Sequence, residues 1–296
     1  MELTFLGTST MAPTKDRNNT AIYLQTEKYG ILFDCAEGTQ RQFKIGKINF
    51  NKLDFILISH HHGDHTLGIC GLIQTLATNN YKKKLTIFGP KDTKKYIKNA
   101  MNSCIFTSKI DLDIIEISNG KIFENENIVI ESLEMTHSVP CVAYSLIQKG
   151  HRRFDLEKMK KLNVKEGPLW NELQKGKSIT VNNKTIKPSD VTFLSSDKKV
   201  TYCIDTSLNK NTYKISKDAD ILICESTFDE DLKDKAQDYG HMSVDEACDI
   251  ANKSKVKQLI LTHFSARYKT TDGILKHAKE YFKNVICAYD FFKVKI

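Results

Sequence analysis

The chain has 296 residues, of which 40% are hydrophobic and 27% are charged, and its formal net charge is +8 at pH 7. These values are typical of a globular protein and exclude the disordered and fibrous classes. No apolar stretch approaches the ~20 residues that a membrane-spanning helix requires. The first ten residues lack the basic and apolar regions of a secretory signal, and the eight cysteines form no CxxC pair. We therefore expect a cytoplasmic protein with reduced cysteines and no membrane segment.

Short apolar runs that are rich in β-branched residues recur along the chain. Several are continuous rather than alternating, which is typical of strands covered on both faces. We expect strands at residues 2–7, 21–26, 30–35, 54–59, 84–89, 128–135, 142–147, 199–205, 220–226 and 258–263. Helical stretches lie between them, at residues 65–80, 91–102, 243–254 and 270–282. Ser243 with Glu246 three residues later predicts a capping box at the start of the third helix. Strands that alternate with helices predict an α/β sandwich.

The segment from residue 150 to residue 188 interrupts this rhythm. Between Lys149 and Lys187 there are eleven Lys or Arg residues against four Asp or Glu residues, an excess of seven positive charges. The rest of the chain holds 33 basic and 32 acidic residues, so nearly all of the net charge lies in this segment. Such a concentration favours contact with a polyanion over an ordinary solvated face. We expect a basic arm, inserted into and projecting from a single domain that spans residues 1–296.

The densest group of chemically active side chains directly follows the predicted strand at residues 54–59. Four of the nine histidines and one aspartate occur within six positions, namely His60, His61, His62, Asp64 and His65. Functional groups in α/β folds collect at the carboxyl ends of strands. Imidazole and carboxylate donors without a thiolate are typical of a catalytic metal ion, and not of a closed structural zinc site. The cluster therefore predicts a catalytic metal site.

Further donors follow other predicted strands. Taken singly, a histidine at a strand end is more often a hydrogen-bonded structural residue than a ligand. Together with the cluster, however, His137, Asp205 and His263 complete the donor set for two ions. We expect one ion to be bound by His60, His62 and His137, the other by Asp64, His65 and His263, and both by a bridging Asp205.

Several motifs resemble the metallo-β-lactamase superfamily, whose signature is the His-x-His-x-Asp-His run. More closely, the chain resembles the short form of the ribonuclease Z family. The resemblance runs almost from end to end, through "GTSTMAPTKDRNNTA", "DCAEGTQRQ", "THSVPCVAY", "ESTF", "GHMSVDEA" and "LTHFSARY". It implies an αββα sandwich and an endoribonuclease that removes the 3′ trailer from precursor tRNA. The products would be a 3′-hydroxyl on the tRNA and a 5′-phosphate on the trailer.

The same resemblance implies cofactors, partners and residue roles. Two zinc ions per subunit are expected, although manganese and iron also suit these ligands. Asp64 would act as a proton acceptor, and His241, held by Glu225, would donate a proton to the leaving oxygen. Asp34 would orient a ligand histidine. Residues 150–188 would form a flexible exosite for tRNA in a homodimer. The substrate-binding residues would be Lys15, Arg17, Arg267, Arg152, Arg153, Gly167 and Pro168.

Three alternatives remain open at this level. The first is another hydrolase on the same fold, such as a phosphodiesterase, a lactonase or a thioesterase, which would not need an arm with seven excess charges. The second is a non-catalytic RNA-binding module with structural metals, which the open ligand set disfavours. The third is a larger nuclease with an added helical domain, for which this chain has no room.

Overall fold

The computed structural model describes residues 1–106, 110–164, 166–181, 183–229 and 232–296. The chain divides into two compact units. The core unit comprises Met1–Ile147 and Lys199–Ile296, and the inserted unit comprises Gln148–Lys198. The predicted insertion at residues 150–188 lies wholly within the inserted unit.

Among the described residues, the core unit is built on two seven-stranded sheets. In the first, the strand order is β18-β1-β2-β3-β4-β5-β6; β18, β1, β2 and β3 pair antiparallel, and β3 to β6 pair parallel. The bounds are β1 (Glu2–Gly7), β2 (Ala21–Gln25), β3 (Gly30–Phe33), β4 (Leu53–Leu57), β5 (Lys84–Gly89), β6 (Asp111–Glu116) and β18 (Lys293–Lys295).

The second sheet has the order β17-β16-β15-β14-β9-β8-β7, in which β14 to β17 pair parallel. Its strands are β7 (Gly120–Glu124), β8 (Ile128–Met135), β9 (Cys141–Gln148), β14 (Lys198–Cys203), β15 (Ile221–Glu225), β16 (Gln258–Thr262) and β17 (Val285–Cys287). Each of the ten predicted strands coincides with a strand of one of these sheets. The continuous apolar runs are buried on both faces, as expected; all five residues of β15 are buried.

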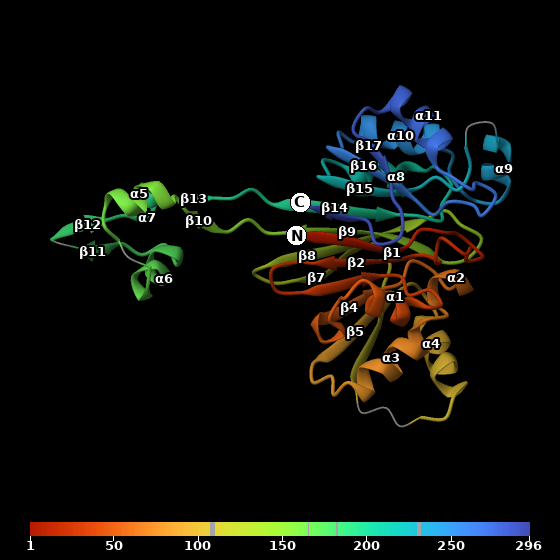
Figure 1. The fold of residues 1–296 in the computed structure, drawn as a ribbon, viewed down its shortest axis with the longest axis horizontal. Coiled ribbons are helices and arrows are strands. Elements are labelled where there is room, and N and C mark those ends of the chain that lie inside the picture. Colours follow the sequence, from red (N-terminus) through yellow and green to blue (C-terminus); the bar gives the residue numbers. More distant parts are fainter. Residues whose placement is uncertain (107–109, 165, 182, 230–231) are drawn as a thin grey trace. The chain divides into compact units, whose positions relative to one another are not determined.

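The outer face of one sheet is covered by α1 (Thr39–Ile45), α3 (Ile69–Thr78) and α4 (Thr93–Asn102), and that of the other by α8 (Lys210–Ser216), α10 (Val244–Lys253) and α11 (Asp272–Tyr281) (Figure 1). The core unit also contains α2 (Gly63–Thr66), α9 (Lys233–Asp238) and a 3₁₀ turn η1 (Phe50–Lys52). The capping box of Ser243 and Glu246 is present at the start of α10. The predicted helix at residues 65–80 is divided into α2 and α3 around Gly68. A Cβ at Gly68 would lie 1.9 Å from the carbonyl oxygen of Ala36, so only glycine fits this crossing of the chain.

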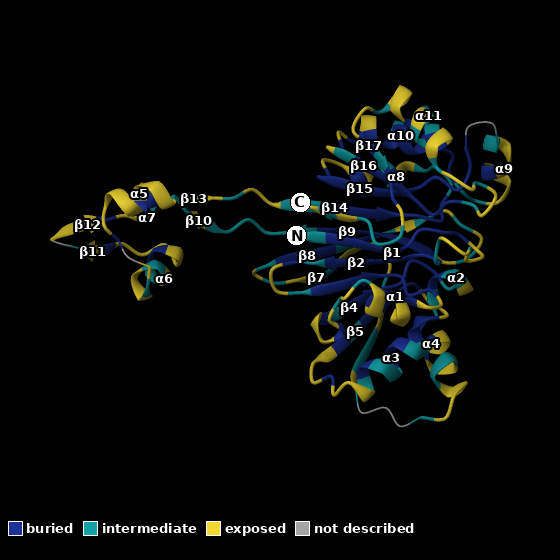
Figure 2. Ribbon diagram, in the orientation of Figure 1, coloured by how far each residue is buried: buried dark blue, intermediate teal, exposed yellow. Residues whose placement is uncertain are grey.

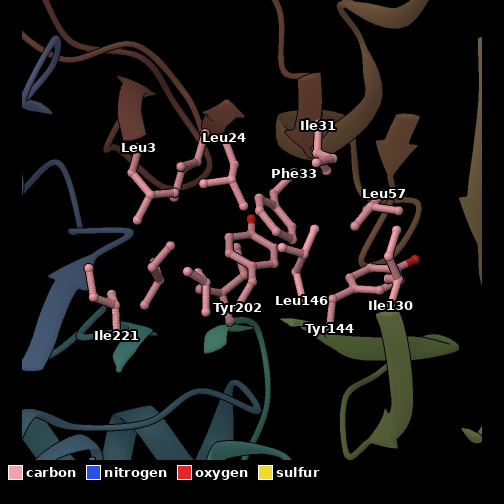
Figure 3. Close-up of a cluster of buried hydrophobic side chains, with 14 of the residues drawn as sticks. Leu3, Leu24, Ile31, Phe33, Leu57, Ile130, Tyr144, Leu146, Tyr202 and Ile221 are labelled. Atoms are coloured by element: carbon pink, nitrogen blue, oxygen red, sulfur yellow. The ribbon is translucent and has the colours of Figure 1, made fainter. Parts of the chain in front are cut away.

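Three apolar clusters hold these layers together. The central one lies between the two sheets and joins residues such as Phe33 and Leu57 to Tyr144 and Tyr202 (Figure 3). A second cluster packs α8, α10 and α11 on one sheet, and a third packs α1, α3 and α4 on the other. The central strands of both sheets are buried, while edge strands such as β6 and β7 and the outer faces of the helices are partly or fully exposed (Figure 2). The predicted α/β sandwich, with the layer order αββα, is confirmed.

The inserted unit has secondary structure and a small core of its own. Its elements are β10 (Arg152–Phe154), α5 (Leu156–Lys161), α6 (Pro168–Gln174), β11 (Ile179–Val181), β12 (Lys184–Ile186), α7 (Pro188–Val191) and β13 (Thr192–Leu194). β10 pairs antiparallel with β13, and β11 with β12. Its buried residues are Met159, Val164, Leu173, Ile179, Ile186 and Val191. Phe154 and Trp170 pack against them with ring centroids 4.6 Å apart.

The structure also bears on two expectations from composition, those on the cysteines and on membrane segments. All eight cysteines are free. Within the described ranges, no helix is long and apolar enough to cross a membrane.

Candidate metal centre

The donors predicted from the sequence lie where strands of the core unit end. The strands and the donors that follow them are β4 and His60, β8 and His137, β14 and Asp205, and β16 and His263. Asp34, Asp205 and His263 adopt left-handed backbone conformations, with φ of 52°, 53° and 61°. Non-glycine residues in this region are strained, and such residues cluster at functional sites.

The structure brings all seven predicted donors together. Ligand atoms of one group, His60, His62 and His137, lie within 4.8 Å of one another, and so do those of a second group, Asp64, His65 and His263. Asp205 lies between them: its Oδ2 is 3.8 Å from His60 Nε2 and 2.7 Å from His65 Nε2. Asp205 also belongs to two further groups of close donor atoms, one with His60 and His65 and one with Glu225, His241 and His263. The assignment of the seven donors to two ions, with Asp205 as the bridge, stays a prediction.

Hydrogen bonds on the outer side of four rings fix which nitrogen faces the centre. The Nδ1 of His65 faces Oδ2 of Asp34 at 2.7 Å, and the Nδ1 of His137 faces the carbonyl oxygen of Gly240 at 3.2 Å. Both oxygens can only accept, so in each ring Nδ1 carries the proton and Nε2 presents a lone pair.

The same logic applies to the other two rings. Ser59 Oγ donates to Asp34, so it accepts from Nδ1 of His60 at 3.0 Å. Thr227 Oγ1 donates to Glu225 at 2.8 Å and accepts from Nδ1 of His263 at 3.0 Å. Four Nε2 lone pairs thus converge on one space, the arrangement in which outer-shell partners orient metal-binding histidines.

The surroundings of Asp205 show that this space fits a cation. Its carboxylate is buried, and Oδ2 makes no hydrogen bond to any described residue. Nε2 of His65 and Nε2 of His263 lie 2.7 and 3.1 Å from this oxygen. Lone pairs that face each other at such distances repel unless a positive charge lies among them. The donor set therefore fits a metal cofactor, and its nitrogen and oxygen atoms suit zinc and similar ions.

His241 and Glu225 form a pair beside these donors. Nδ1 of His241 lies 2.9 Å from Oε2 of Glu225 and 3.1 Å from Oδ1 of Asp205. Burial disfavours the charged ring, but Glu225 and then Asp205 outweigh it and raise the pKa of His241 to about 10. Glu225 is fully buried, and it also accepts a hydrogen bond from Thr206 N at 2.8 Å. The geometry can therefore hold a protonated imidazole at the edge of the metal centre.

The loop at residues 11–17, from which no donor to the centre was predicted, also contacts it. The backbone N–H of Met11 donates to Oδ2 of Asp64 at 2.6 Å. Arg17, in the same loop, donates from one guanidinium nitrogen to the carbonyl oxygens of Ser265, at 3.4 Å, and Tyr268, at 2.5 Å. The guanidinium of Arg17, predicted to contact RNA, is thus at least partly used to join this loop to the segment after His263.

The other predicted substrate-binding residues fall into two groups. In the core unit, Lys15 is exposed beside Asp16, and the guanidinium of Arg267 lies 5.0 Å from the centre of the Phe228 ring. The remaining four lie in the inserted unit: Arg152 and Arg153 in β10, and Gly167 and Pro168 at the start of α6. Their contact with RNA stays a prediction.

His61, which the signature spacing excludes from the ligand set, is turned to other partners. Its Nε2 lies 2.7 Å from Thr93 Oγ1, and its ring stacks on Tyr96. His61 therefore packs the turn at residues 60–65 against α4.

Two stacked mixed sheets, outer helices and a histidine turn at the strand ends define a protein of the metallo-β-lactamase fold. The metallo-β-lactamase fold protein YhfI from Bacillus subtilis matches with a TM-score of 0.71 and 21% identity, over 99% of this chain and 98% of its own. Human tRNase Z, short form, matches with a TM-score of 0.75 and 24% identity, over 100% of this chain and 99% of its own.

Sequence comparison narrows this class. The family model described as "Anti-Pycsar protein Apyc1" matches residues 1–284. "Ribonuclease Z" of Nitrosopumilus maritimus is 38% identical over 298 residues, which cover 100% of both chains. The chain therefore belongs to the family of that model and, with its full-length relatives, to the ribonuclease Z family. The resemblance stated from the sequence motifs is confirmed.

Proposed function

We propose that this chain is a metal-dependent endoribonuclease that removes the 3′ trailer from precursor tRNA. The observation that carries the proposal is the convergence of seven His and Asp donors beside the His241–Glu225 pair, in a chain 38% identical to a ribonuclease Z over its whole length. The expected products are a 3′-hydroxyl on the tRNA and a 5′-phosphate on the trailer.

Two zinc ions are the proposed cofactors. His60, His62 and His137 would hold one, Asp64, His65 and His263 would hold the other, and Asp205 would bridge them. When bound, the ions lower the pKa of a water molecule to near 7 and neutralise charge that develops on the phosphoryl oxygens. Manganese and iron suit the same donors.

The chain's own groups move the protons. Hydrolysis joins the oxygen of water to phosphorus and breaks the bond from phosphorus to the 3′ oxygen of the tRNA. Asp64, whose Oδ2 is fixed by Met11 N–H, accepts the proton of the attacking water. His241, charged beside Glu225, donates a proton to the departing 3′ oxygen. Asp64 thus takes up one proton and His241 releases one, so the protons of the reaction balance.

Substrate selection is assigned to residues outside the donor cluster. The inserted unit would bind the tRNA backbone with residues that include Arg152, Arg153, Gly167 and Pro168, since lysine and arginine contacts to phosphate give affinity without reading sequence. The 3′ end of the tRNA would be bound by Lys15, Arg17 and Arg267. We also infer a cytoplasmic homodimer, on the resemblance to short-form ribonuclease Z; the sedimentation velocity of the full chain tests the dimer.

The decisive experiment is incubation of the chain with a 5′-labelled precursor tRNA that carries a trailer. We expect one cut at the trailer junction, a free 3′-hydroxyl on the tRNA, and loss of cleavage when a chelator is added. Asp64→Ala should stop cleavage, and His241→Ala should slow it strongly. An uncut precursor in the presence of zinc and of manganese contradicts the proposal.

The family model that matches residues 1–284 has a name other than ribonuclease Z, so a second function on the same fold is tested as well, that of a phosphodiesterase or thioesterase. Turnover of a small phosphodiester, a cyclic nucleotide, a thioester and precursor tRNA by one preparation separates the two. If a small substrate turns over faster than the precursor at equal concentration, the second candidate is favoured.

A further inference from the structure

A tyrosine from one sheet reaches the metal centre through a carboxylate on the other sheet. The hydroxyl of Tyr202, in β14, donates to Oδ2 of Asp34, at the end of β3, at 2.6 Å. The same oxygen accepts hydrogen bonds from Ser59 Oγ and His65 Nδ1, each at 2.7 Å. The other oxygen of Asp34 accepts from Ser59 N at 2.7 Å. Three donors therefore meet on one oxygen, and one of them is a ring proposed to bind metal.

The packing of Tyr202 fixes the direction of this hydroxyl. The side chain is fully buried, and its ring stacks on Phe33 with centroids 4.9 Å apart and an interplanar angle of 30° (Figure 3). Phe33 directly precedes Asp34 in the chain. Burial and the nearby Asp34 raise the pKa of Tyr202 well above its ordinary value, so the hydroxyl stays a donor. Neither the Tyr202 ring nor the Asp34 carboxylate has room to move, because both are fully buried in the same core.

We propose that Tyr202 is a positioning residue of the metal centre: its hydroxyl fixes the Asp34 carboxylate, and Asp34 in turn fixes the His65 ring. The inference rests on the proposed metal centre and goes beyond it, because it assigns a role to a residue that touches no donor. A buried carboxylate with several donors has one preferred orientation, and loss of one donor lets it rotate. Rotation of Asp34 turns the His65 ring away from the geometry that a metal requires.

The test is the zinc affinity of the full chain, measured by competition with a chromophoric chelator. Tyr202→Phe removes only the hydroxyl and leaves the ring to pack on Phe33. We expect zinc binding to weaken about tenfold, the lower end of the range for outer-shell partners of metal ligands. Tyr81→Phe is the matched control, because Tyr81 is also buried and donates its hydroxyl to a backbone oxygen, that of Leu53, at 2.7 Å. We expect its zinc affinity to be unchanged within about twofold.

A double-mutant cycle shows whether the effect passes through Asp34. Asp34→Asn should weaken zinc binding at least tenfold by itself, and Tyr202→Phe should add nothing when Asp34 is already Asn. Unchanged affinity in Tyr202→Phe overturns the proposal, as does an equal loss in Tyr81→Phe or a full additional loss in the double variant. If Tyr202→Phe does not fold, unchanged affinity in Asp34→Asn overturns it alone. Failure of precursor cleavage by the parent chain would refute the proposed function and leave this binding result standing.

Discussion

The core unit buries the charged groups around its donor cluster, whereas the charged groups of the inserted unit lie mostly on the surface around a small apolar core. Asp34, Glu225 and His65 are fully buried in the core unit, and each has a partner of fixed geometry. In the inserted unit, Glu172 pairs with Lys175 and Lys177 at 3.3 and 3.2 Å through side chains that are 39% to 68% exposed. Buried groups of this kind are hardly screened, while exposed pairs contribute little and respond to salt. From this difference we expect catalysis to depend on the core unit and RNA affinity on the inserted unit, so that substitutions in one unit leave the property of the other unchanged.

The largest loss of activity is expected from a substitution of His241 in the core unit. We expect His241→Ala to lower kcat on precursor tRNA by roughly 10²- to 10⁴-fold, the usual contribution of a general acid. Bound zinc, measured by elemental analysis at saturating zinc, should be unchanged because all seven proposed ligands are retained. His277→Ala is the control, since His277 pairs with Asp229 at 2.7 Å in a similar way and lies outside the donor groups. Equal losses in both variants contradict the role of His241.

The second test acts on the core of the inserted unit. Leu173 is fully buried in its cluster of six residues, so Leu173→Ala should destabilise this unit by roughly 2–5 kcal/mol. Trp170, the only tryptophan of the chain, lies in this unit and reports its unfolding by fluorescence. Zinc affinity and turnover of a small phosphodiester should stay unchanged. Simultaneous loss of zinc binding would show that the two units do not fold independently.

A buried carboxylate of the core unit predicts a pH dependence of stability. Asp290 accepts hydrogen bonds from Thr8 Oγ1, Asn18 N and Gln42 Nε2 at 2.9, 2.8 and 3.1 Å. Burial raises its pKa from 3.8 to about 6, and the hydrogen bonds and Arg17 offset only part of this rise. The folded pKa is above the unfolded one, so the stabilisation is complete below pH 4 and is lost as the pH rises through 6.

The measurement compares the free energy of unfolding of the parent chain with that of Asp290→Asn from pH 4 to pH 7. The difference of about two pKa units corresponds to about 3 kcal/mol. Over this interval, the parent should lose about that much stability relative to the variant. A constant difference between the two chains contradicts the raised pKa.

The smallest expected effect concerns the surface charge of the inserted unit. Changing Lys158, Lys160 and Lys161 to Gln should weaken precursor binding about tenfold at moderate salt and reduce the slope of log affinity against log salt by up to about 2.7. Turnover of a small phosphodiester should not change. The matched control removes three lysines from the core unit, Lys214, Lys217 and Lys255, which line a cavity of about 540 Å³. An equal loss in the control would show that affinity is not specific to the inserted unit.

Local patterns in the sequence predicted ten of the fourteen described strands of the two sheets and the seven candidate donors, whereas the four edge strands, β6, β7, β17 and β18, were not predicted. Each continuous apolar run became a strand, because a segment with no polar face must be covered on both sides wherever it lies. The seven donors could be chosen because each follows such a run, and the ends of strands are marked locally in the sequence. The capping box at Ser243 is equally local, since both of its partners lie within four residues.

The contacts that orient these donors come from residues far apart in the chain and follow from the tertiary fold. Tyr202 and Asp34 are 168 residues apart and meet because two sheets pack face to face at one register. Asp290 likewise accepts a hydrogen bond from Thr8, 282 residues away in the chain. The donor to Asp64 is the backbone N–H of Met11, which a side-chain motif in the sequence cannot predict. Arg17 was expected to contact RNA, yet its guanidinium also joins two loops. A change of a few tenths of an ångström in the donor–acceptor distance decides whether a hydrogen bond forms. The packing of the whole core sets these distances, and no local sequence pattern does.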